Sequence, residues 1–173
     1  MPDFPRALSH IKDIVYGATD GIITTFAVIA GASGAGLPVS TILIMGFANL
    51  LADGFSMASS DYLGSRSEID LANKEGRNTS KIPSPVASAG VTFFAFVVGG
   101  LVPLLTYLVS PHESVTFTDT LWATGGALVV IGALRGMVAK KHFIRTALET
   151  VIIGAAAAGI AYGVGGFVES LVR

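Results

Sequence analysis

Five stretches of the chain are long enough and apolar enough to cross a membrane as helices. A spanning helix needs about 20 mostly apolar residues, and five separate blocks of the sequence meet that requirement. The predicted spans cover residues 14–36, 40–63, 86–109, 120–139 and 147–168. The pattern therefore predicts an all-α membrane protein with a single transmembrane domain over residues 1–173. Its only sizeable polar segment is a predicted loop at 64–85.

Basic residues between these spans predict how the chain is oriented. Cytoplasmic loops of membrane proteins carry an excess of Lys and Arg. Ten of the eleven basic residues fall before the first span, in the second loop or around the fourth loop, and only Arg173 falls on the other side. This alternation predicts a cytoplasmic N-terminus, a cytoplasmic loop 64–85 and a C-terminus outside.

Composition and motifs narrow the function. Only 13% of the residues are charged and the net charge is -1, so nothing indicates a nucleic-acid partner. The chain has no cysteine, which excludes disulfides, thiolate zinc sites and iron–sulfur clusters. The sequence has no phosphate-binding loop, no nucleophile elbow and no zinc-protease motif. We therefore expect no enzyme activity and no permanently bound cofactor.

Two acidic residues fall inside predicted spans, where a charge is costly. A carboxylate near the bilayer centre costs about 2.5–3.5 kcal/mol on insertion scales, so it is expected to face protein, water or a partner. Asp20 lies in the first span, with Thr24 one turn further on the same face. Gly17 and Gly21 form a small-xxx-small pair that lets helix backbones touch. Alternatively, Asp20 is a carboxylate that caps or snorkels near the interface.

The second span carries a polar stripe. Asn49, Asp53, Met57 and Asp61 are spaced four residues apart and so share one slowly winding face. Ser56 and Ser60 widen this stripe. Such a face must line protein or water, either as a path for a cation or as a structural polar network. Met57 is either a packing residue or a soft ligand, which beside carboxylates suits Fe²⁺ or a neighbouring transition ion.

Two runs of sequence resemble the vacuolar iron transporter family. The first is YGATDGIITTFA at residues 16–27, which is similar to the first-helix signature of that family. The second is NLLADGFSMA at residues 49–58, followed by Asp61 and Glu68, and it is similar to the family's second helix. The resemblance extends over the whole chain as a five-helix layout.

The resemblance implies a two-fold homodimer that exchanges Fe²⁺, and in some members Mn²⁺, for protons. The ion path of such a dimer lies at its interface, with Asp20 and Met57 matching family ligands. The spacing of Gly17 and Gly21 leads us to expect that they pack the dimer. Plant-type members carry a glutamate where this chain has Asn49, and Asp53 is one turn away. They also have a glutamate-rich cytoplasmic domain that this chain lacks, so the resemblance is to a short member.

These observations predict a proton-coupled exporter of Fe²⁺ or Mn²⁺ from the cytosol. The expected metal ligands are Asp20, Asp53, Met57 and Asn49, and the expected path lining is Thr24, Ser56 and Ser60. Asp61 and Glu68 are expected at the cytoplasmic entrance. The expected partners are lipid, metal ion, protons and a second copy of the chain, in a prokaryotic inner membrane. The alternative is a non-transporting structural or regulatory subunit whose polar stripe docks a partner protein.

Overall fold

The computed structural model describes residues 10–79, 82–109 and 117–173, and in these residues it contains five helices and no strand. The helices are α2 (Ile11–Gly34), α3 (Val39–Lys74), α4 (Pro85–Val109), α5 (Phe117–Val138) and α6 (Phe143–Val172). Each is long and apolar enough to span a membrane. The prediction of five spanning helices is therefore confirmed.

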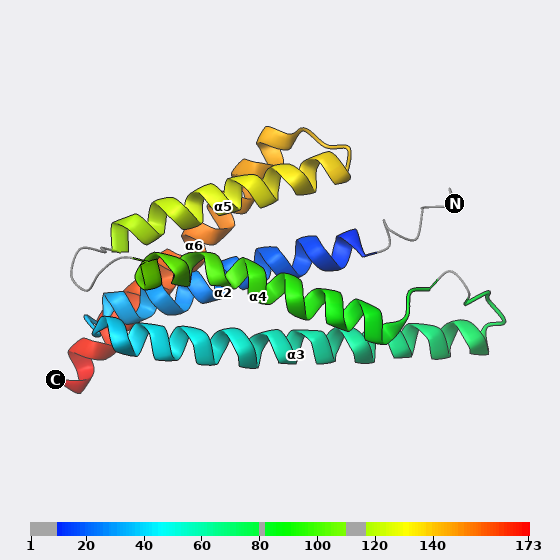
Figure 1. Cartoon of the computed structure of the whole chain (residues 1–173), viewed down its shortest axis with the longest axis horizontal. Helices are drawn as coiled ribbons and strands as arrows, with labels where there is room; N and C mark the ends of the chain where they lie inside the picture. Colours follow the sequence, from blue (N-terminus) through cyan, green and yellow to red (C-terminus); the bar gives the residue numbers. More distant parts are fainter. Residues whose placement is uncertain (1–9, 80–81, 110–116) are drawn as a thin grey trace.

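Helix α2 lies at the centre of the bundle. It packs against all four other described helices, whereas α3 contacts only α2 and α4, and α6 contacts only α2 and α5. Figure 1 shows α3 along one side of the bundle and α5 with α6 on the other side of α2. The first predicted span is thus the one whose side chains meet the most neighbours.

Two groups of buried side chains hold α2 in this central position. Ile29 and Phe96 belong to a fully buried cluster that joins α2, α3 and α4. Phe26 and Ala158 belong to a smaller cluster between α2 and α6. Outside these clusters, many large apolar side chains stay exposed, and Trp122 is 75% exposed. An apolar outer surface of this kind is expected where helices face lipid instead of water.

Small residues bring α2 and α4 into backbone contact. A Cβ added to Gly21 would lie 2.1 Å from the carbonyl oxygen of Phe96, and one added to Gly17 would lie 2.7 Å from that of Thr92. Both glycines are buried inside one chain. The two glycines that were expected to pack a dimer thus lie against α4 of their own chain. A small-xxx-small pair marks a close helix contact, but α4 of the same chain already occupies it.

Helix α3 continues well past the predicted end of the second span. It runs to Lys74 and has 36 residues, a length of about 54 Å, so the prediction of a loop over 64–85 is wrong for residues 64–74. Hydropathy falls after Leu63 because the helix leaves the apolar zone, not because the helix ends. A Schellman cap closes the helix just after Lys74. It is formed by Gly76, which has a positive φ, and by two backbone hydrogen bonds, from Gly76 N–H to Asn73 O and from Arg77 N–H to Ala72 O.

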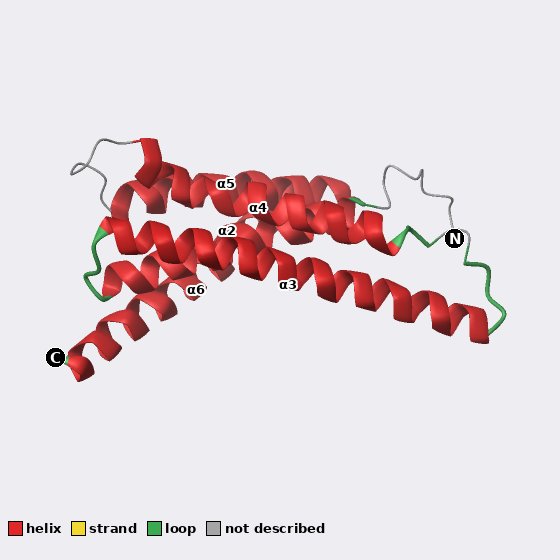
Figure 2. Ribbon diagram, turned by 60° about the horizontal axis from the view of Figure 1, so that its bottom comes forward, coloured by secondary structure: helices red, strands yellow, loops and turns green. Residues whose placement is uncertain are grey.

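The basic segments gather at one end of the bundle. Figure 1 places the start of α2, the end of α3 and the connection between α5 and α6 at the same end, with the C-terminus at the opposite end. Figure 2 shows the last turns of α3 extending beyond the neighbouring helices at that end. The predicted alternation of basic loops thus agrees with the observed order of the helices.

Candidate functional site

Asp20 and Asp53 lie at the same depth in the α2–α3 hairpin. Asp20 precedes the last residue of α2, Gly34, by fourteen positions, and Asp53 follows the first residue of α3, Val39, by fourteen positions. At 1.5 Å per residue, each acid is about 21 Å from the tight turn that joins the two helices. Helices α2 and α3 also pack against one another. The hairpin therefore brings together the two acids that the sequence singled out.

Neither acid is neutralised by a basic side chain in the part of the chain that the structure describes. The ion pairs found there join other residues: His10 with Asp13, Glu75 with Arg77, Arg145 with Glu149, and Glu169 with Arg173. Asp20 and Asp53 are each half-buried. Two like charges in such a setting cost free energy unless a cation or a proton compensates them. The pair is thus suited to bind one or the other.

Asn49 and Met57 flank Asp53 along α3, one turn on either side. All three side chains are partly buried. They run beside the buried row Gly46, Leu50, Gly54 and Ala58, which faces α4. Met57 packs against the cluster of Phe96 and Leu50, so at least part of its side chain is a packing element. Met57 also lies one turn from Asp53, so its side chain belongs to the partly buried strip that Asn49, Asp53 and Met57 form along α3.

The three residues expected to line the path differ in their surroundings. The Thr24 hydroxyl donates a hydrogen bond to the backbone carbonyl of Asp20 at 2.9 Å, so its oxygen lone pairs remain free to accept or to coordinate. Ser56 and Ser60 lie on the exposed side of α3, next to Phe55 and Leu63, which are 69% and 63% exposed. The polar stripe therefore continues from the half-buried acids onto the outer surface of the chain.

Asp61 is fixed to a neighbouring helix. The Thr92 hydroxyl of α4 donates a hydrogen bond to Asp61 Oδ2 at 2.9 Å, and Thr92 is only 2% exposed. Eight residues separate Asp61 from Asp53, which is about 12 Å along the helix. Glu68 lies further out on the projecting part of α3 and is exposed. The acids of α3 therefore form a line that runs from the end of the bundle toward the Asp20–Asp53 pair.

One chain supplies few acidic ligands for a metal ion. No group of three or more His, Cys, Asp or Glu side chains that could hold an ion occurs among residues 10–79, 82–109 and 117–173. The donors near one another are the two carboxylates, with Met57, Asn49 and Thr24 on adjoining turns. Such a set is incomplete for a transition ion unless water or another chain adds ligands.

Sequence reasoning missed the anchoring of Asp61. Thr92 lies 31 residues away on α4, and a lone threonine in an apolar span carries no signal of its partner. Arg135, a basic residue in the last turn of α5, forms no ion pair with any described residue. It lines a groove between α2 and α5 instead.

Comparison with known proteins identifies the family. A sequence model described as the VIT family matches residues 11–82 and 71–166. The two matched segments meet at the projecting end of α3 and the connection that follows it. Together they include all the site residues described above.

Curated relatives match over nearly the whole chain. Vacuolar iron transporter 2 of Oryza sativa subsp. japonica is 27% identical, and the match covers 93% of this chain and 88% of the relative. Vacuolar iron transporter 1 of Tulipa gesneriana is also 27% identical, with 95% and 90% covered. For vacuolar iron transporter homolog 3 of Arabidopsis thaliana the identity is 27%, with 93% and 84% covered.

The relatives differ in length within the matched region. The rice match extends over 217 residues, more than the 173 of this chain, whereas the Arabidopsis match extends over 168. The rice protein therefore has additional residues inside that region. All three relatives are plant proteins whose names contain the word vacuolar, so they give no support to a prokaryotic inner membrane. The family match and the five apolar helices show that this chain is an integral membrane protein that belongs to the VIT family.

Proposed function

We propose that the chain transports a divalent transition-metal ion, Fe²⁺ or Mn²⁺, out of the cytosol in exchange for protons. The observation that carries this proposal is the pair of half-buried acids, Asp20 and Asp53, at one depth of a membrane-spanning hairpin without a basic partner among the described residues. The relatives are named as iron transporters, which agrees with this cargo.

The two acids supply the chemistry of exchange. A carboxylate in low-dielectric surroundings is unfavourable when uncompensated, so it binds either a cation or a proton. Loss of the metal ion is then coupled to uptake of protons at the same oxygens. Met57 adds a soft thioether to these hard oxygens, a combination that favours Fe²⁺ over Mg²⁺ and Ca²⁺.

A second copy of the chain would complete the ligand set. One chain offers two acids near one another, and a two-fold axis beside the hairpin would bring four together. The exposed strip of Ser56 and Ser60 next to Asp53 supports this arrangement. Polar groups are unfavourable against lipid, so a partner surface is the better neighbour for this strip. The ion path in this proposal lies between the two copies.

Flux measurements test the transport proposal. The protein in liposomes with a fixed pH gradient is expected to move Fe²⁺ or Mn²⁺, and Asp20→Asn or Asp53→Asn is expected to lower that flux at least about tenfold. Asp70→Asn is the matched control, because Asp70 is an exposed acid on the projecting part of α3. Its flux should equal that of the unmodified chain. Equal flux in all three variants would rule out the assignment.

The absence of cysteine from the chain makes the dimer directly testable. A single Ser56→Cys or Ser60→Cys variant is expected to form a disulfide-linked dimer under mild oxidation, since a disulfide requires Cα atoms within about 7 Å. Ile152→Cys on the exposed side of α6 is the control and should stay monomeric. Crosslinking at Ile152 but at neither serine would place the contact elsewhere.

The alternative function is a structural or regulatory subunit whose polar stripe docks another protein. That subunit would show no metal flux in liposomes and no stabilisation by Fe²⁺ or Mn²⁺. The transporter is expected to show a higher thermal unfolding midpoint with either ion, and Asp53→Asn should remove the effect.

A further inference from the structure

A groove separates the start of α2 from the end of α5. It has a volume of 520 Å³. One wall includes Lys12, Val15 and Thr19 of α2, and the other is formed by Arg135, Val138 and Ala139. This volume is within the range of about 300–1,000 Å³ that is typical of small-molecule sites. The groove lies at the basic end of the bundle, which is the end opposite the turn between α2 and α3.

The groove combines two cations with an apolar body. Lys12 is the second residue of α2 and Arg135 lies in the last turn of α5. No acidic side chain lines the groove, and neither cation forms an ion pair within the described ranges. The remaining wall is formed mostly by Ile11, Val15, Val138 and Ala139. The two cations therefore complement an anion, and the apolar wall suits an apolar portion of the same molecule.

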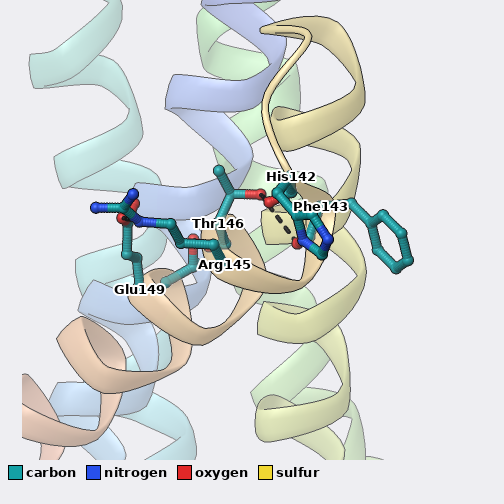
Figure 3. A network of polar contacts seen from close by, with 6 residues as sticks. His142, Phe143, Arg145, Thr146 and Glu149 are labelled. Atoms are coloured by element: carbon teal, nitrogen blue, oxygen red, sulfur yellow. Dashed lines mark hydrogen bonds and ion pairs between the residues drawn. The ribbon is translucent and has the colours of Figure 1, made fainter.

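Another basic residue at the same end shows the contrast. Figure 3 shows Arg145 directed toward Glu149 at the start of α6, with 3.2 Å between Arg145 Nε and Glu149 Oε1. Thr146 in the same turn donates to the backbone carbonyl of Phe143 at 3.0 Å. These groups satisfy one another, whereas Lys12 and Arg135 line an open groove without an acid.

We propose that this groove binds one anionic phospholipid, with its phosphate between Lys12 and Arg135 and an acyl chain along Val15, Thr19 and Val138. The groove opens between two membrane-spanning helices, so its apolar part lies where acyl chains are available. Basic pockets between spanning helices recognise anionic head groups in this way. Tyr16, also in the groove and 64% exposed, suits the head-group region, where tyrosine is enriched.

Lipid titration of the full-length protein tests this site. The probes are phosphatidylglycerol and phosphatidylcholine with identical acyl chains, added to the protein in detergent and followed by native mass spectrometry. Phosphatidylglycerol should bind more tightly, and Lys12→Gln or Arg135→Gln should each weaken its binding about fivefold. Binding of phosphatidylcholine should change little.

Two controls separate this site from general electrostatic attraction. Arg66→Gln with Lys74→Gln removes two exposed basic residues of α3 outside the groove and should leave phosphatidylglycerol binding unchanged. Ala139→Phe keeps both cations but fills the groove, and it should weaken binding of the lipid.

Several results would overturn the lipid site. These are equal binding of the two lipids, an equal loss in the α3 control, or unaltered phosphatidylglycerol binding in the Lys12 and Arg135 variants. Displacement of the lipid by millimolar inorganic phosphate would assign the cations to a free anion instead. None of these results depends on metal flux, so the lipid site and the transport proposal can fail separately.

Discussion

Thr92 of α4 donates a hydrogen bond from its hydroxyl to Asp61 Oδ2 of α3, at 2.9 Å. This bond is the one side-chain hydrogen bond between α3 and α4 in the part of the chain that the structure describes. It holds the Asp61 carboxylate in one position relative to the neighbouring helix.

Removal of this donor is expected to destabilise the protein. Thr92→Val keeps the shape of the side chain but leaves Asp61 without its partner, and hydrogen bonds to charged groups contribute about 1.5–3 kcal/mol. The thermal unfolding midpoint in detergent should fall by several degrees. Thr118→Val, on the exposed side of α5, is the control and should leave the midpoint unchanged. An unchanged midpoint in Thr92→Val would show that the bond is not a stabilising one.

A side chain at Gly21 is expected to separate α2 from α4. The added Cβ of Gly21→Ala would lie 2.1 Å from the Phe96 carbonyl oxygen, and overpacking of this kind costs about 1–3 kcal/mol. Gly159→Ala on α6 meets nothing within 4 Å and serves as the matched control. Comparison of their unfolding midpoints checks the prediction. A midpoint for Gly21→Ala equal to that of the control would contradict the close contact.

Substitution of Met57 is expected to change metal selection with little effect on the fold. Met57→Leu preserves volume, so its packing cost should stay below about 1.5 kcal/mol. Loss of the soft sulfur should lower Fe²⁺ flux roughly tenfold. Met137→Leu, at an exposed position on α5, controls for loss of a methionine. Retained Fe²⁺ flux in Met57→Leu would make Met57 a packing residue only.

Glycine in place of Lys140 is expected to stabilise the turn between α5 and α6. Lys140 has φ 53° and occupies the position after the helix cap, with backbone bonds from Lys140 to Met137 and from Lys141 to Gly136. A non-glycine residue in this conformation costs about 1 kcal/mol. Lys140→Gly should therefore raise the unfolding midpoint by a few degrees. Lys141→Gly, which removes the same charge at a position without positive φ, should give no increase.

The sequence alone predicts the number of helices and places Asp20 and Asp53 inside two of them. Hydropathy reports which residues prefer lipid, so it locates the five spans, but it cannot show that α3 continues as a helix into water. The end of that helix is determined by the Gly76 cap, which is a local backbone signal. Helix ends that coincide with a fall in hydropathy were therefore predictable, whereas the end of α3, which is set by a cap, was not.

Contacts between spans were harder to predict than the spans. The spacing of Gly17 and Gly21 shows that another backbone approaches, but the same spacing suits α4 of the same chain or α2 of a second copy. In the structure, the backbone that approaches these glycines is that of α4 in the same chain. The bond between Thr92 and Asp61 joins residues 31 positions apart, and no periodicity within either helix specifies that pairing.

The short turn between α2 and α3 is the reference point from which the depths of both acids are set. Each acid is fourteen positions from its own end of that turn, so extra residues inserted in the turn would leave the depths matched. Deletion of one residue between Val39 and Asp53 would instead shift Asp53 by about 1.5 Å and rotate it by roughly 100° around α3. Natural variation in length is thus tolerable in this turn and disruptive in the helical stretches that lead from it to the acids.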